Sequence, residues 1–109
     1  MTEDNRPGSQ TTRAADMKIR LRYLLFLPQN YGDDPGKKWP LLLFLHGMGE
    51  RGDNLDLLRT YGPAKIAEHQ PEFSFICLTP QCPEGETWIG QLRVLKLLLD
   101  EVTSSYSVD

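Results

Sequence analysis

The chain has 109 residues, with 12 Lys and Arg against 15 Asp and Glu, and a formal net charge of −3. This length predicts one small domain, and the near balance of charge leaves no basic excess to neutralise the phosphates of a nucleic acid. No apolar run approaches the roughly 20 residues that cross a bilayer. We therefore expect neither a nucleic acid nor a membrane among its partners.

The N-terminal segment is polar and lacks the apolar core of a signal peptide. We expect residues 1–17 to form a disordered tail and residues 18–109 to form the folded domain. Cys77 and Cys82 fit neither a zinc pattern nor a C-x-x-C redox motif, and in an extended strand they would lie roughly 16 Å apart, too far for a disulfide. Two reduced thiols without a signal peptide predict a cytoplasmic protein.

Three segments have the pattern of β-strands. Residues 18–28 alternate between polar and apolar side chains and then become continuously apolar before Pro28. Residues 39–45 and 72–80 are short, nearly continuous apolar runs. Such runs are typical of strands that are covered on both faces of a sheet.

Two segments predict helices, the first in residues 53–70. There Asp53 or Asn54 can cap a first turn, Gly62 breaks it, and Pro63 suits the first position of a new helix.

The second helix is predicted in residues 91–106, where Lys96 and Asp100 can pair on the outer side. Apolar residues recur at steps of three and four and predict one buried face, formed by Leu92, Leu95, Leu99, Val102 and Tyr106. Strands that alternate with helices predict an α/β fold, with a mostly parallel sheet of about three strands and flanking helices.

The motif HGMGERG, residues 46–52, directly follows the second apolar run. Gly47, Gly49 and Gly52 spell G-x-G-x-x-G, the fingerprint of a site for NAD or FAD. Such a site needs a helix that starts within the motif and an acidic residue at the end of the next strand. That strand ends in LTPQ, without an acid, and Glu68 falls in a predicted helix. The sequence therefore disfavours a dinucleotide site, and no cofactor is expected.

The same motif fits the oxyanion-hole loop of an α/β-hydrolase, which supplies a backbone N–H after the third strand. Four blocks, taken together, resemble a family of bacterial carboxylesterase-like and phospholipase-like serine hydrolases, similar to polyhydroxybutyrate depolymerases and feruloyl esterases: YLLFLPQNY, KKWPLLLFLHGMGERGDN, YGPAKIAE and FICLTPQCPEGETW. The resemblance runs from Tyr23 to Asp109. It implies a partial α/β-hydrolase fold, the N-terminal part of that domain.

The resemblance also implies roles for single residues. Met48 would donate its backbone N–H to the oxyanion, while Gly47 and Gly49 shape the turn. His46 would pin the loop rather than take part directly in catalysis. Trp88 resembles a position near the acyl pocket, and its alternative role is that of a core aromatic covering the sheet edge.

A metal site at the motif is not expected. His46 and Glu50 stand four residues apart, but the glycines around them prevent a helix that would place both side chains on one face.

The sequence lacks the G-x-S-x-G motif of a serine nucleophile, and Ser104, Ser105 and Ser107 have no glycine near them. In the family, a segment like SYSVD leads directly into the nucleophile strand. We therefore expect an N-terminal fragment of a serine esterase that lacks the catalytic Ser, Asp and His and is inactive alone. The full-length enzyme would act on a small carboxylic ester.

The alternative to a fragment is a non-catalytic hydrolase-like module. In either case, a sheet whose last strand is unpaired predicts self-association through that exposed edge.

Overall fold

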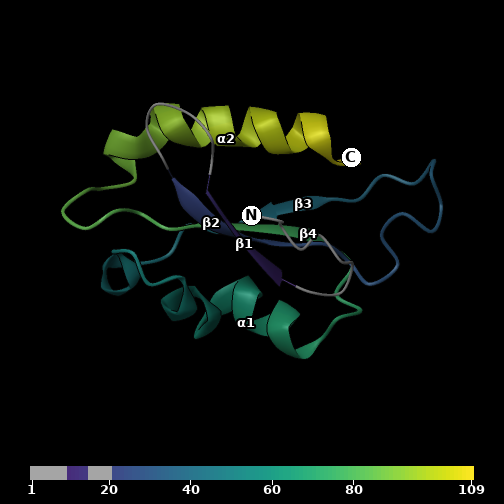
Figure 1. Ribbon diagram of the computed structural model, residues 1–109, viewed down its shortest axis with the longest axis horizontal. Coiled ribbons are helices and arrows are strands. Elements are labelled where there is room, and N and C mark those ends of the chain that lie inside the picture. Colours follow the sequence, from purple (N-terminus) through teal and green to yellow (C-terminus); the bar gives the residue numbers. More distant parts are fainter. Residues whose placement is uncertain (1–9, 15–20) are drawn as a thin grey trace.

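The computed structural model describes residues 10–14 and 21–109 (Figure 1). Its strands and α-helices are β1 (Gln10–Ala14), β2 (Arg22–Phe26), β3 (Leu41–Leu43), α1 (Gly62–His69), β4 (Ile76–Pro80) and α2 (Leu92–Ser105). Short 3-10 helices lie in the connections, namely η1 (Met48–Glu50), η2 (Leu55–Arg59) and η3 (Ile89–Gln91). The α/β class that the sequence predicts is confirmed. None of the described helices has the length and apolarity needed to cross a membrane.

The described strands form one sheet in the order β1-β2-β4-β3. β3 and β4 are parallel, whereas β2 is antiparallel to both β1 and β4. The sheet is therefore mixed rather than mostly parallel. Parallel neighbours need a crossover connection, and only the β3–α1–β4 unit supplies a helix for it. Residues 27–40 connect β2 to β3 without an α-helix, and β3 lies beyond β4 rather than beside β2.

Strand β1 lies within the segment that the sequence predicts to be disordered. Residues Gln10–Ala14 pair antiparallel with Arg22–Phe26, so the prediction is wrong for this stretch. The backbone ladder supplies hydrogen bonds that do not depend on apolar side chains, and so a polar sequence can join the sheet. The rest of residues 1–17 lies outside the described residues.

Helices cover both faces of the sheet, with α2 on one side and α1 on the other (Figure 1). On the α2 side, the core combines alternate residues around β2 with residues of β4 and α2: Leu21, Tyr23, Leu25, Leu27, Ile76, Leu78, Val94, Leu95, Leu98 and Val102. On the α1 side, β2 contributes Leu24 and Phe26 to two smaller clusters. Successive side chains of a strand point to opposite faces of the sheet. A strand in a sheet that helices cover on both faces must therefore be continuously apolar.

Helix α2 buries a face that differs slightly from the predicted one. Val94, Leu95, Leu98 and Val102 are its buried residues, whereas Leu92 is 59% exposed. Leu92 is the first residue of α2, directly after η3, and the buried face begins only at Val94. The predicted ion pair between Lys96 and Asp100 is confirmed, with 3.1 Å between Nζ and Oδ2.

The predicted start of the first helical segment is also confirmed. The Asn54 side chain caps η2 by accepting a hydrogen bond from the Asp56 N–H at 3.1 Å. Gly62 has φ +66° at the start of α1, and a Cβ there would lie 3.0 Å from the ring of Phe44. Glycine is needed at this position both for the left-handed backbone and for the close approach of α1 to the end of β3.

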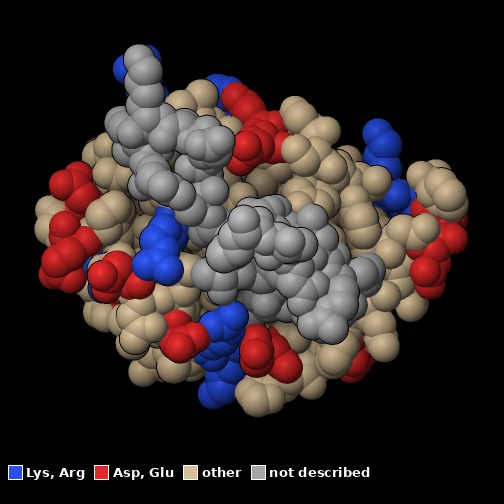
Figure 2. Space-filling view, viewed as in Figure 1, with Lys and Arg blue, Asp and Glu red and all other residues tan. Residues whose placement is uncertain are grey.

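The surface charges are mixed. On the face seen in Figure 2, acidic and basic side chains are interspersed among uncharged residues. This distribution agrees with the small net charge of the chain.

Candidate functional site

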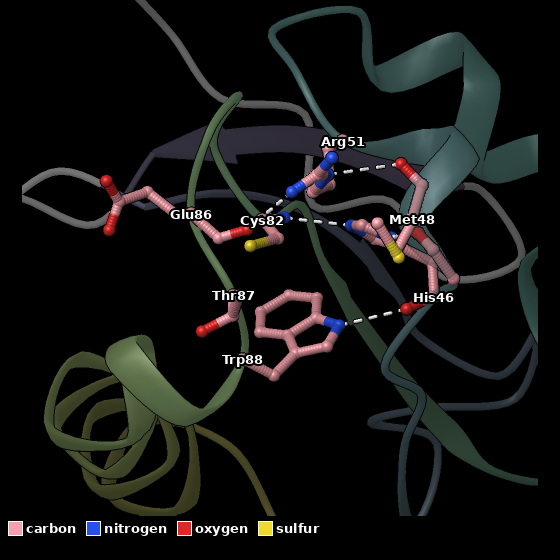
Figure 3. Close-up of a pocket in the computed structure, with 8 residues that line it drawn as sticks. His46, Met48, Arg51, Cys82, Glu86, Thr87 and Trp88 are labelled. Atoms are coloured by element: carbon pink, nitrogen blue, oxygen red, sulfur yellow. Dashed lines mark hydrogen bonds between the residues drawn. The ribbon is translucent and has the colours of Figure 1, made fainter.

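The candidate site lies where the chain leaves β3 and β4. Because these strands are parallel, their carboxyl ends lie at the same end of the sheet, and open α/β sheets bind ligands at that end. Two segments meet there: residues 44–54, here called the glycine loop, and residues 81–88, here called the β4 loop. A pocket of about 160 Å³ lies between them (Figure 3), lined by His46, Gly47, Met48, Arg51, Cys82, Glu86, Thr87 and Trp88.

The structure brings together four of the five residues that the sequence singled out. His46, Gly47, Met48 and Trp88 all line the pocket, whereas Gly49 does not. Trp88 also packs against the core on the α2 side.

The chain leaves β3 earlier than predicted. The strand ends at Leu43 rather than Leu45, although the Phe44 N–H still donates to the Leu78 carbonyl at 3.0 Å. A single 3-10 turn, η1, then forms inside the glycine loop. The first helix that the sequence predicts lies in residues 53–70, so η1 is an additional helical turn that precedes it.

The η1 turn is too short to support the dinucleotide interpretation. The Glu50 and Arg51 amides donate to Gly47 and Met48 carbonyls at 3.4 and 3.3 Å, which closes one turn. Arg51 then returns to extended backbone, with φ −66° and ψ 155°. A pyrophosphate site would need a helix that continues from the glycines, and the next α-helix starts only at Gly62.

His46 is fixed by hydrogen bonds at both ring nitrogens. Its side chain is only 4% exposed. The Cys82 N–H donates to Nε2 at 2.8 Å, so the proton resides on Nδ1, which donates to the Gly47 carbonyl. The imidazole is therefore held as one neutral tautomer, and neither nitrogen remains free for a substrate or a metal ion.

Trp88 binds the backbone of the same histidine. Its Nε1–H donates to the His46 carbonyl at 2.9 Å, and the two ring centroids lie 4.9 Å apart in an edge-to-face arrangement (Figure 3). This contact places the indole against the glycine loop, with one side on the pocket.

Arg51 and Gln81 also join the two loops, and sequence reasoning missed both. Arg51 donates to the Glu86 carbonyl at 2.9 Å and to the Met48 carbonyl at 3.2 Å. Buried Gln81 donates from Nε2 to the Glu50 and Asn54 carbonyls at 2.9 and 2.8 Å. In the sequence, Gln81 stands out only because no acid occupies the end of the strand.

These contacts form what we call the loop clamp, the set of hydrogen bonds that His46, Arg51, Gln81 and Trp88 make between the two loops. Gly52 adds a backbone bond from its N–H to the Cys82 carbonyl at 3.0 Å, and its φ of +127° suits glycine. The clamp fixes the glycine loop relative to the β4 loop on both sides of η1.

The backbone N–H groups at the start of η1 remain available. Within the described residues, the amides of Gly47, Met48 and Gly49 donate to no acceptor. The first N–H groups of a helix have no partner inside the helix, which explains why these amides donate to no acceptor within the described residues. The Met48 side chain is 76% exposed, so it does not enclose this backbone.

The pocket contains no nucleophile paired with a base. Cys82 is a free, buried thiol, and burial raises its pKa, an effect that nearby Arg51 opposes and Glu86 reinforces. A thiol of this kind is protonated at neutral pH and a poor nucleophile. Ser104 and Ser105 lie in the last turn of α2, whereas the pocket lies before its first turn. Across residues 10–14 and 21–109, no group of His, Cys, Asp and Glu is suited to hold a metal ion.

Comparisons with known proteins support the fold. No protein-family model matches the chain, and no curated protein sequence matches it. Among solved structures, the chain is similar to a thermostable esterase, with a TM-score of 0.69 and 21% sequence identity over 94% of this chain. The likeness covers 32% of the esterase, so the chain spans about a third of its length. At this identity the likeness shows an esterase-like α/β fold.

Proposed function

We propose that this chain is the part of a serine hydrolase for carboxylic esters that carries the oxyanion-hole loop. One observation carries the proposal: free backbone N–H groups stand at the start of η1, in the loop that follows the parallel strand β3 and beside a pocket. Acyl transfer develops negative charge on the carbonyl oxygen of the substrate, and fixed N–H groups stabilise that charge. The esterase-like fold is consistent with this chemistry.

In this proposal, Met48 donates its N–H to the oxyanion. Gly47 and Gly49 have no Cβ that could hinder the approach of a substrate, and a Cβ at Gly49 would meet open space. An oxyanion donor acts best when it needs no reorganisation during the reaction. The loop clamp supplies this rigidity, because His46 is held just before η1, and Gln81 binds the carbonyls of Glu50, the last residue of η1, and of Asn54.

The size of the pocket favours an ester whose acyl group is small. Its volume of about 160 Å³ is close to that of cavities, about 150 Å³, that hold a benzene molecule in other proteins. Trp88 and Cys82 provide apolar surface on the side of the β4 loop. We assign Trp88 to the wall of the acyl pocket.

The catalytic Ser, Asp and His would come from the remaining part of a longer enzyme. The described pocket offers no nucleophile and base, because His46 is occupied and Cys82 is protonated. The ester substrate is a small molecule, and the two free thiols favour a cytoplasmic protein.

The test begins with the DNA that follows the codon of Asp109. A G-x-S-x-G sequence in any frame, followed by an acid and a histidine, is expected. The protein that contains this chain together with the downstream sequence, here called the joined protein, should then hydrolyse p-nitrophenyl acetate and butyrate. A serine-directed phosphonate should label it. If no such sequence follows, or if the joined protein is inactive although folded, the non-catalytic module replaces this proposal.

The joined protein also tests the role of Trp88. Trp88→Ala enlarges the pocket and should raise the ratio of butyrate to acetate turnover. Trp88→Phe is the matched control, because it loses the hydrogen bond to the His46 carbonyl but keeps an aromatic wall. An unchanged ratio in Trp88→Ala would remove Trp88 from the acyl pocket.

A further inference from the structure

Arg51 carries the one permanent positive charge among the residues that line the described pocket. Its guanidinium lies between the two loops and binds a carbonyl of each (Figure 3). Nε donates to the Met48 carbonyl of the glycine loop at 3.2 Å, and Nη1 donates to the Glu86 carbonyl of the β4 loop at 2.9 Å. Both acceptors are neutral backbone oxygens, so neither hydrogen bond neutralises the charge.

No carboxylate neutralises this charge either. Across residues 10–14 and 21–109, no Asp or Glu forms an ion pair with Arg51. Glu86 lines the same pocket, but its carboxylate accepts a hydrogen bond from Gln91 Nε2 at 3.2 Å. Arg51 is only partly exposed, and a charge that water screens incompletely acts over several ångströms. Arg51 therefore gives the pocket a local positive field.

The Cys82 thiol, which also lines the pocket, shows the sign of this field. Burial raises the pKa of Cys82, Arg51 opposes the rise, and Glu86 adds to it. Arg51 thus favours a negative charge in the pocket, and Glu86 disfavours one. Cys77 provides a reference, because it does not line the pocket and burial raises its pKa against the effect of a hydrogen bond with Thr79.

The Arg51 side chain also holds part of the backbone at the start of η1. The Met48 carbonyl accepts from Arg51 Nε and from the Arg51 backbone N–H, the latter at 3.3 Å. This carbonyl shares a planar peptide group with the Gly49 N–H, one of the amides that donate to no acceptor within the described residues. Fixing the carbonyl therefore also fixes the direction of that N–H.

We propose that Arg51 is a positioning residue of this site, which orients the η1 backbone and, through its unpaired charge, favours the anionic transition state of ester hydrolysis. The role rests on the proposed function. Arg51 acts from beside the pocket and through the Met48 carbonyl, and Glu86 has the opposite electrostatic effect. The transition state carries a negative charge that the neutral ester lacks, so Arg51 affects kcat more than KM.

Titration of the Cys82 thiol tests the electrostatic effect in this chain by itself. The carbon-13 shift of Cβ, followed by NMR over a pH series, gives the pKa of each cysteine separately. Arg51→Met removes the positive charge and should raise the pKa of Cys82, whereas Glu86→Gln should lower it. Arg51→Lys keeps the charge and should shift the pKa less than Arg51→Met does. Arg51→Gln is a second uncharged variant in case Arg51→Met does not fold.

Two controls separate a local field from a general effect of charge. Lys65→Met removes an equal charge from the exposed surface of α1, outside the pocket, and should leave the pKa of Cys82 unchanged. The pKa of Cys77 should stay the same in every variant. Circular dichroism establishes that the variants are folded. An unchanged pKa of Cys82 in Arg51→Met, or an equal shift in Lys65→Met, overturns the proposal.

The joined protein tests the role of Arg51 in the reaction. Arg51→Met should lower kcat about tenfold, less than the loss of a direct oxyanion donor, and should change KM less than about twofold. Arg51→Lys should restore kcat to within about threefold of the parent. An unchanged kcat in Arg51→Met, or an equal loss in Arg51→Lys, overturns the role of Arg51. An inactive parent refutes the proposed function itself, whereas the titration of Cys82 does not depend on activity.

Discussion

Replacing His46 by alanine tests the loop clamp, because this one side chain joins the glycine loop to the β4 loop. The variant leaves the buried Cys82 N–H without its acceptor and the Gly47 carbonyl without its donor. An unsatisfied buried donor costs about 1–3 kcal/mol, and the loss of a second neutral hydrogen bond adds about 0.5–1.5 kcal/mol. We expect the free energy of unfolding to fall by about 2–4 kcal/mol, a large part of the stability of a small domain.

The assay is urea unfolding followed by circular dichroism at a concentration where the chain is monomeric, combined with hydrogen exchange of the Cys82 amide. His69→Ala is the matched control, because His69 is exposed at the end of α1 and should cost less than about 0.5 kcal/mol. The Cys82 amide should exchange faster in His46→Ala than in His69→Ala. Equal stability of the two variants, or an unchanged exchange rate at Cys82, would refute the clamp.

Three further predictions concern the chain by itself. It should hydrolyse neither p-nitrophenyl acetate nor butyrate, and turnover that a serine-directed phosphonate abolishes would contradict the absence of a nucleophile. Gly62→Ala should lower the free energy of unfolding by more than about 1 kcal/mol, because φ is +66° and the new Cβ would meet Phe44, whereas Gly36→Ala, at a site without this constraint, should cost less; equal costs would contradict this reasoning. Burial raises the pKa of Cys77 from 9.0 to about 11, so its contribution to stability is complete below pH 9 and is lost as the pH rises through about 11. The difference in unfolding free energy between the chain and Cys77→Val should follow that pH course, and a constant difference would contradict it.

The elements that local pattern determines could be predicted from the sequence. The apolar run of β3, the Asn54 cap and the glycine at the start of α1 each depend on residues within a few positions of one another. The location of the pocket could also be predicted, because it lies at the carboxyl ends of two neighbouring parallel strands.

Contacts between distant residues could not be predicted in the same way. Gln81 binds the Glu50 carbonyl from 31 positions away, and no local pattern distinguishes it from an ordinary surface glutamine. The pairing of β1 with β2 is a similar case, because the backbone ladder that holds a polar strand leaves no periodic signature. The 3-10 turn η1 forms from two backbone bonds among glycines, where side-chain patterns say little.

The most direct test of the central claim is the turnover of Met48→Pro in the joined enzyme. Proline lacks the N–H, and it suits the first position of η1. Gly47 already has the extended backbone that a following proline requires, with φ −80° and ψ −177°, and the Met48 N–H holds no other bond within the described residues. If Met48 is the oxyanion donor, kcat should fall by roughly 100- to 1000-fold, as for other single donors. Met48→Ala keeps the N–H and should stay within about threefold of the parent. A Met48→Pro enzyme that keeps the parental kcat, or a Met48→Ala enzyme that loses as much, would contradict the oxyanion role of this loop.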